Sequence, residues 1–172
     1  MNFNEKTLVK NYVFNGKIIK VKNDQVLLPN GKPAFREIVE HNGGSCVYCE
    51  CEDKVLLVNQ FRYAYGENLW EIPAGKLNQG EDAKQTALRE LEEECGVKAQ
   101  NLQEICKIYP SCGYTSEIIH LYKANGITKT QQKLDEDEFL TYKWFTKDQL
   151  RKMIDKGEIK DAKTLIALLR FL

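Results

Sequence analysis

One segment, Gly75–Val97, constrains the fold of this chain more than any other part of its sequence. Residues 82–95 are predicted to form a helix, and Gly96 is predicted to end it. At about 100° per residue, Ala87 and Leu91 fall on one apolar stripe of that helix. The stripe is predicted to face the core of the protein.

Three glutamates share the flank beside this stripe. Glu90 and Glu94 are four residues apart and project together, and Glu93 lies next to them. Exposed like charges at this spacing repel by about 0.2–0.5 kcal/mol per pair, and Arg89 is placed to pair with Glu93. Oxygen ligands without His or Cys favour Mg²⁺ or Mn²⁺ over zinc. Taken alone, these three glutamates are also explained as a solvated acidic face of the helix.

Composition narrows the classes of partner. The 172 residues include 25 Lys+Arg and 25 Asp+Glu, so no global positive field is available for nucleic acid or a membrane surface. No stretch approaches the roughly 18 apolar residues of a membrane span, and residues 1–10 lack the apolar run of a signal peptide. We therefore expect a cytoplasmic protein with reduced cysteines and with no nucleic-acid or membrane partner.

A zinc site is not expected at Cys46, Cys49 and Cys51, although a Cys-x-x-Cys pair can start one. No second pair of cysteines or histidines completes four ligands, and successive residues of a strand face opposite ways. These thiols are predicted to be small buried hydrophobes. His41 and His120 are isolated in the sequence and are predicted to be structural.

The rest of the chain predicts strands on both sides of the helix and two helices at the end. Turn signals at residues 15–16 and 29–31 divide residues 1–42 into short strands. Residues 45–59 are predicted to form two strands around a turn at residues 52–54. Further strands are predicted in the ranges 70–73, 102–109, 118–122 and 142–145. Thr146–Gln149 has the form of a capping box, and Asp161 has that of a helix N-cap. This order favours an α+β fold over repeated βαβ units.

The acidic segment also resembles a known family signature. Five residues separate Gly75 from Glu81, and seven more lead to Arg89-Glu90-Leu91, then Glu93-Glu94 and Gly96-Val97. These nine specified positions match the Nudix box, which is far more specific than a lone glycine motif. The chain is therefore identified as a member of the Nudix hydrolase family.

The resemblance implies a mixed-sheet α/β/α sandwich in which a loop–helix–loop carries Mg²⁺ or Mn²⁺. The implied metal ligands are Ala74 (through its carbonyl oxygen), Glu90, Glu93, Glu94 and Glu138. Arg89 is expected to hold a glutamate in position and, with Glu93, to serve catalysis. Gly75, Glu81 and Gly96 are expected to be structural. The metal would neutralise a diphosphate and lower the pKa of the attacking water.

Softer similarities across nearly the whole chain resemble the ADP-ribose pyrophosphatase subfamily. They lie at residues 28–31, 36–41, 60–63, 70–75, 114–121 and 157–162. This resemblance implies hydrolysis of ADP-ribose to AMP and ribose 5-phosphate by a homodimer whose N-terminal strands help build the partner's site. We therefore expect residues 1–42 to be a small antiparallel β-sheet element for dimerisation and substrate binding, and residues 43–172 to be the Nudix domain.

Four residues are candidates for substrate binding through the same resemblance. Arg36 and Arg62 match substrate-contacting positions, and a guanidinium fork suits phosphate; a surface arginine paired with a carboxylate is the alternative for each. Phe35 is placed to stack on adenine, with an ordinary core or interface aromatic as the alternative. Glu117 is a further acidic candidate near the phosphates.

An acidic run at residues 135–138 follows a polar loop at 128–133. The resemblance implies a mobile catalytic loop with Glu136 as general base and with Glu138 reaching a metal. A base must come within one hydrogen bond of the water, and a flexible loop can deliver it after substrate binds. A simple solvated charge run is the alternative.

One departure from the subfamily leaves the substrate open. The chain has Ser111-Cys112-Gly113 where the subfamily usually has Ser-Pro-Gly. Other nucleoside diphosphate sugars therefore stay possible substrates, for a GDP-sugar or a broad nucleotide-sugar Nudix pyrophosphatase. A non-catalytic ligand-sensing Nudix domain is a further alternative. The intact Nudix box argues against it.

Overall fold

The computed structural model describes residues 3–172 of the chain. It forms two compact units, each described by itself. The first contains the N-terminal residues up to Gly43 together with Tyr109–Ile118, and the second contains Gly44–Ile108 and Ile119–Leu172.

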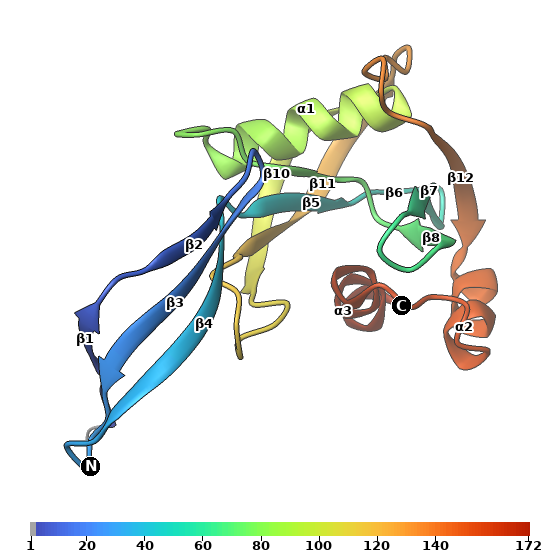
Figure 1. The fold of residues 1–172 in the computed structure, drawn as a ribbon. Coiled ribbons are helices and arrows are strands. Elements are labelled where there is room, and N and C mark those ends of the chain that lie inside the picture. Colours follow the sequence, from blue (N-terminus) through green and yellow to red (C-terminus); the bar gives the residue numbers. More distant parts are fainter. Residues whose placement is uncertain (1–2) are drawn as a thin grey trace. The chain divides into compact units, whose positions relative to one another are not determined.

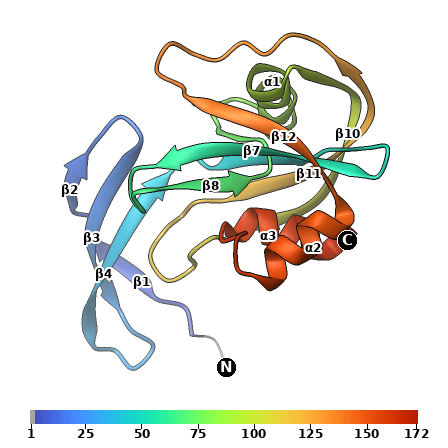
Figure 2. The ribbon, with the colours of Figure 1, turned by 90° about the vertical axis from the view of Figure 1, so that its right-hand side faces the viewer.

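The first unit is built on a four-stranded antiparallel sheet (Figure 2). Its strands are β1 (Lys6–Val9), β2 (Tyr12–Asn15), β3 (Ile19–Leu27) and β4 (Pro33–His41). β3 pairs with β4 along its whole length, and with β1 and β2 on its other edge. The expected turns lie where the sequence places them, and Gly31 adopts the left-handed φ of 78° that suits glycine. The predicted N-terminal antiparallel sheet is confirmed.

Charged side chains inside this sheet are paired. The Lys22 Nζ lies 2.7 Å from a Glu40 carboxylate oxygen and 3.4 Å from Asp24, and the Tyr12 hydroxyl donates to Glu40 at 3.0 Å. Since each buried charge has an opposite charge beside it, the desolvation cost of placing them there is offset.

The second unit combines two four-stranded sheets with three helices. Its elements are β5 (Gly44–Tyr48), β6 (Glu50–Cys51), β7 (Lys54–Arg62), β8 (Glu67–Glu71), β9 (Ala74–Lys76), α1 (Ala83–Cys95), β10 (Val97–Ile108), β11 (Ile119–Lys129), β12 (Leu140–Thr146), α2 (Lys147–Asp155) and α3 (Ala162–Phe171). One sheet has the order β10-β11-β5-β9, and the other has β12-β7-β6 with β8 paired to β7. The pairing of β11 with β5 is parallel and the others are antiparallel, so the first of these sheets is mixed.

The sheets separate two hydrophobic clusters because alternate residues of a strand face opposite ways. Val47 and Cys49 pack in the cluster that contains Ala87 and Leu91 of α1. Cys46 and Tyr48 pack in the cluster that contains Leu150 of α2 and Ala167 and Leu168 of α3. Figure 1 shows α1 on one side of the strands and α2 and α3 on the other. The predicted α/β/α sandwich is therefore confirmed. Cys46 and Cys49 are buried as expected, whereas Cys51 is only partly buried because it lies at the end of β6 next to the exposed turn.

Local capping signals predicted the helices closely. Asp82 caps α1 by accepting from Lys84 N and Gln85 N, and Gly96 ends it with a φ of 59°. The capping box at Thr146 starts α2, and Asp161 caps α3 by accepting from Thr164 N.

Three strand predictions were too short or too simple. β10 begins at Val97, directly after the helix, and β11 continues to Lys129, because each strand supplies the hydrogen bonds of the other from Val97↔Lys129 onward. The stretch 45–59, predicted as two strands, forms the three strands β5, β6 and β7, and the predicted turn lies between β6 and β7. Glu52 and Asp53 take the left-handed φ values of 48° and 59° between β6 and β7, as a two-residue hairpin turn requires.

Candidate active site

The strand β9 and the helix α1 approach each other at a glycine. A Cβ atom on Gly75 would lie 1.8 Å from Glu90 Oε1, so any larger residue would displace that carboxylate. One residue earlier, the Ala74 amide donates to Glu94 Oε2 at 2.9 Å. The sequence Ala74-Gly75 therefore brings backbone against the two carboxylates that the helical spacing predicted to lie together.

Glu90 and Glu94 are buried, with 9% and 2% of their surface exposed. Desolvation is the main cause that raises the pKa of each carboxyl group, and the pKa of Glu94 stands well above its usual range. Repulsion from Glu90 adds to the rise at Glu94, whereas Arg89 opposes the rise at Glu90. A buried carboxylate pair of this kind favours the arrival of a cation.

Arg89 contacts three carboxylates, one of which, Glu90, belongs to this pair. Its Nη1 lies 2.8 Å from Glu93 Oε2 and 2.8 Å from Glu90 Oε1, and its Nε donates to Glu81 Oε1 at 3.1 Å. Glu81 in turn accepts from the Asn78 amide at 2.9 Å. Arg89 and Glu81 thus contact each other, and the holding role of Arg89 and the bracing role of Glu81 stay predictions.

The five predicted metal ligands are not all gathered at one point. Within residues 3–172, no three acidic, histidine or cysteine side chains lie close enough together to hold a metal ion. Glu93 is turned to Arg89, and Glu138 lies in the loop after β11. The residues that are brought together are Glu90, Glu94 and the backbone at Ala74. The oxygen donors of this buried carboxylate pair fit a hard divalent cation, and the roles of Glu93 and Glu138 stay predictions.

A second buried carboxylate, Glu71, lies at the end of β8. The Arg62 Nε and Nη2 donate to its two oxygens at 2.6 Å and 2.7 Å, and the Lys163 Nζ donates at 2.5 Å. Burial acts to raise the pKa of Glu71, but the hydrogen bond from Arg62 and the charge of Lys163 outweigh it and lower the pKa. Arg62, a predicted substrate ligand, is thus oriented by a carboxylate.

Neither Glu71 nor Lys163 was singled out from the sequence. They are 92 residues apart in the chain, so no local spacing connects them. The only sequence signal was their position in or next to the subfamily-like stretches 70–75 and 157–162.

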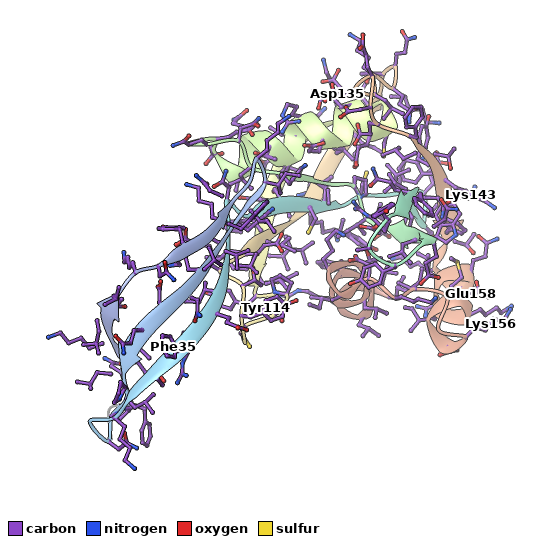
Figure 3. The ribbon with its side chains drawn as sticks, viewed as in Figure 1. Phe35, Tyr114, Asp135, Lys143, Lys156 and Glu158 are labelled. Atoms are coloured by element: carbon purple, nitrogen blue, oxygen red, sulfur yellow. The ribbon has the colours of Figure 1, made fainter. Side chains whose placement is uncertain are left out.

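The other predicted substrate residues lie in the first unit. Arg36 Nε donates to Glu5 Oε2 at 2.8 Å. Phe35, labelled on β4 in Figure 3, is 64% exposed, so it is not a core aromatic of this chain. A Glu117 carboxylate oxygen lies 3.5 Å from His41 Nδ1, and that nitrogen accepts from the Gly43 amide at 3.0 Å. His41 thus has the structural contacts expected of it.

The acidic loop after β11 carries the predicted base. Glu136 is exposed there, and Glu138 is partly buried. Desolvation, followed by repulsion from Asp135, raises the pKa of Glu138. Both glutamates are in the second unit together with Glu90 and Glu94, and the assignment of the base stays a prediction.

Comparison with known proteins decides the family. A model described as the NUDIX domain matches residues 40–168. This chain belongs to the Nudix family. Residues 5–39 match a model described as the nucleoside diphosphate sugar hydrolase N-terminal domain. The two matches meet at the end of β4.

Individual relatives of this Nudix protein cover almost its whole length. A methanol dehydrogenase activator of Bacillus methanolicus is 42% identical over 96% of this chain and 91% of its own. An ADP-ribose pyrophosphatase of Bacillus subtilis (strain 168) is also 42% identical, over 95% of this chain and 90% of its own length. A solved ADP compounds hydrolase shares the fold, with a TM-score of 0.85 at 18% identity over 98% of this chain and 93% of that one. Among residues 3–172, no helix has the length and apolar character needed to span a membrane.

Proposed function

We propose that this Nudix protein is a metal-dependent pyrophosphohydrolase that hydrolyses ADP-ribose to AMP and ribose 5-phosphate. The observation that carries the proposal is the buried pair Glu90 and Glu94 on α1, held against the Ala74-Gly75 backbone. The substrate is taken from the Bacillus subtilis relative, whose name is ADP-ribose pyrophosphatase.

The proposed chemistry divides among few side chains. Glu90 and Glu94 would hold Mg²⁺ or Mn²⁺, which when bound neutralises the diphosphate and acidifies a water. Arg89 pairs with both Glu90 and Glu93. Glu136 would accept the proton of the attacking water, with Glu138 as the alternative base or a further ligand. Arg62, oriented by Glu71, would present its guanidinium to a phosphate.

The N-terminal sheet supports a homodimer as part of this proposal. Its exposed large apolar side chains are Leu8, Val9, Tyr12, Val13, Phe14, Ile18 and Phe35. Exposed apolar side chains in this number on a small sheet mark an interaction site, and a second copy of this chain is the proposed partner. Sedimentation of a Phe14→Asp variant should give monomers, whereas a variant that sediments like the wild type would remove the sheet from the interface.

The location proposed is the cytoplasm. The six free cysteines are compatible with the reducing environment of that compartment. The balanced net charge of +0 also supports a small nucleotide rather than a nucleic acid as the substrate.

Release of AMP from ADP-ribose by the purified protein, with Mg²⁺ and with Mn²⁺, tests the function. ADP-glucose, GDP-mannose, NADH and flavin adenine dinucleotide form the comparison panel, since Cys112 departs from the subfamily. Preferred cleavage of ADP-ribose supports the proposal. Preferred cleavage of GDP-mannose would identify a GDP-sugar as the substrate and leave the proposed pyrophosphate hydrolysis unchanged. The absence of any metal-dependent cleavage would favour a non-catalytic ligand-sensing domain.

The Glu94→Gln variant is the catalytic control in this assay. Glu92→Gln is its matched partner, because Glu92 lies on the same helix and pairs with Lys98 at the surface. Activity that survives Glu94→Gln would mean that the observed cleavage does not come from this site.

A further inference from the structure

The acidic loop after β11 is bound to the C-terminal end of α1. The Thr130 amide donates to the Gly96 carbonyl at 2.7 Å, and the Lys133 amide donates to the Glu93 carbonyl at 2.9 Å. Between them, the Gln132 side-chain Nε2 donates to the Glu94 carbonyl at 2.7 Å. The last carbonyls of a helix have no partner inside the helix, and here the loop satisfies them.

Gly96 allows this close approach. A Cβ atom on Gly96 would lie 2.7 Å from Gln132 N and 2.9 Å from Thr130 O. The residue also has a left-handed φ of 59°, which glycine adopts without strain. The glycine that was predicted only to stop the helix therefore also makes room for the loop.

The anchored part of the loop ends at Leu134, which packs against the hydrophobic cluster beneath α1. Asp135, Glu136 and Asp137 then are exposed, and the Glu138 amide closes a turn by donating to Asp135 O at 3.0 Å. Figure 3 labels Asp135 in this part of the loop. Only a short tip, residues 135–138, thus carries the candidate bases beyond the last anchor.

We propose that Gln132 is a positioning residue of the active site, and that its bond to Glu94 fixes where the tip can place Glu136 and Glu138. This inference rests on the proposed function. Glu94 is the shared point, since its side chain accepts from Ala74 N and its carbonyl accepts from Gln132. One residue therefore joins β9, α1 and the base of the acidic tip.

Gln132 is the member of the anchor that mutation can test, because the two neighbouring bonds come from backbone amides. Removal of its amide leaves the donors of both backbone bonds intact, but the bond of the Lys133 amide should then open more often and free the start of the tip. Misplacement of a catalytic group by about 1 Å can lower turnover by up to roughly 100-fold. A residue that merely caps the helix would change stability and leave the kinetic constants alone.

The test compares Gln132→Leu with Gln131→Leu, a neighbouring exposed position, by steady-state hydrolysis of ADP-ribose. We expect Gln132→Leu to lower kcat about tenfold with KM changed less than about threefold, and Gln131→Leu to behave as the wild type. Equal kinetics for the two variants would overturn the proposal.

A double-mutant cycle shows whether Gln132→Leu lowers kcat through Glu136 and Glu138 or in another way. In a Glu136→Gln/Glu138→Gln background, Gln132→Leu should cause no further loss of kcat. A full tenfold loss in that background, or wild-type activity of the background itself, would overturn the proposal.

The hydrogen-exchange rate of the Lys133 amide tests the anchor without an activity assay. Gln132→Leu should speed that exchange, and Gln131→Leu should not. If the wild type releases no AMP from ADP-ribose, the proposed function fails, and unchanged exchange in Gln132→Leu would separately overturn the anchor.

Discussion

Two buried glutamates in the second unit have opposite electrostatic surroundings. Glu71 and Glu94 are equally buried, with 2% of each exposed. Glu71 contacts Arg62 and Lys163, and its pKa is lowered. Glu94 accepts from the Ala74 amide and lies near Glu90, and desolvation drives its pKa well above the usual range.

The difference separates a structural carboxylate from a functional one. Transfer of a carboxylate out of water costs several kcal/mol even after relaxation. At Glu71 this cost is offset by cations of the same chain. At Glu94, no Lys or Arg side chain among residues 3–172 forms an ion pair with the carboxyl group, and a divalent cation can stabilise its charged form. We therefore infer that the Glu71 cluster stabilises the fold. We also infer that the burial of Glu94 lowers the free energy of unfolding of the metal-free protein, and that its function is to bind the metal.

The largest expected effect is that of Glu94→Gln on activity. Loss of a charged oxygen ligand should lower kcat/KM for ADP-ribose by at least roughly 100-fold. The same variant should unfold at a higher temperature than the wild type in EDTA, because an amide is cheaper to bury than a carboxylate. Calorimetry in EDTA measures the unfolding temperature. A lower unfolding temperature for Glu94→Gln than for the wild type would show that Glu94, like Glu71, stabilises the fold.

The next largest effect is that of Lys163→Met on stability. It leaves Glu71 buried with one cation fewer, which should lower the free energy of unfolding by about 3 kcal/mol. Urea denaturation gives the value from the shift in midpoint at unchanged slope. The matched control is Lys160→Met, whose exposed pair with Glu67 should contribute less than about 1 kcal/mol. Equal losses for the two variants would show that the Glu71 cluster is not the stabilising element.

A smaller effect is the pH dependence that Glu71 contributes. Its pKa in the folded protein lies below the ordinary value of 4.5 for a glutamate side chain, so its stabilisation is fully present above about pH 4.5 and is lost as pH falls through the folded pKa. The stability gap between the wild type and Glu71→Gln should therefore be widest near pH 6 and shrink toward pH 3. Thermal unfolding across this range measures the gap, and a constant gap would show that the Glu71 pKa is not lowered.

The sequence predicted the features that local spacing controls. Glu90 and Glu94 were placed on one flank of α1 because they are four residues apart, and Gly96 and Thr146 marked helix ends through their own backbone preferences. The depth of burial of Glu94 was not predictable, since it depends on the approach of β9 at Gly75.

Contacts between distant segments account for what the sequence missed. The pairing of Glu71 with Lys163 joins β8 to α3, and the bond from Gln132 to Glu94 joins a loop to the helix 38 residues before it. The extended pairing of β10 with β11 arises in the same way. Each needs the tertiary fold, which hydrophobic periodicity alone does not specify.

Binding of Mn²⁺ by the wild type, Glu94→Gln and Glu71→Gln, followed by the loss of the free-ion electron paramagnetic resonance signal, tests the contrast between the two carboxylates most directly. We predict that the wild type binds Mn²⁺, that Glu94→Gln weakens binding at least about tenfold, and that folded Glu71→Gln binds as the wild type does. Wild-type affinity in Glu94→Gln would contradict the assignment of the buried α1 carboxylates as the metal site.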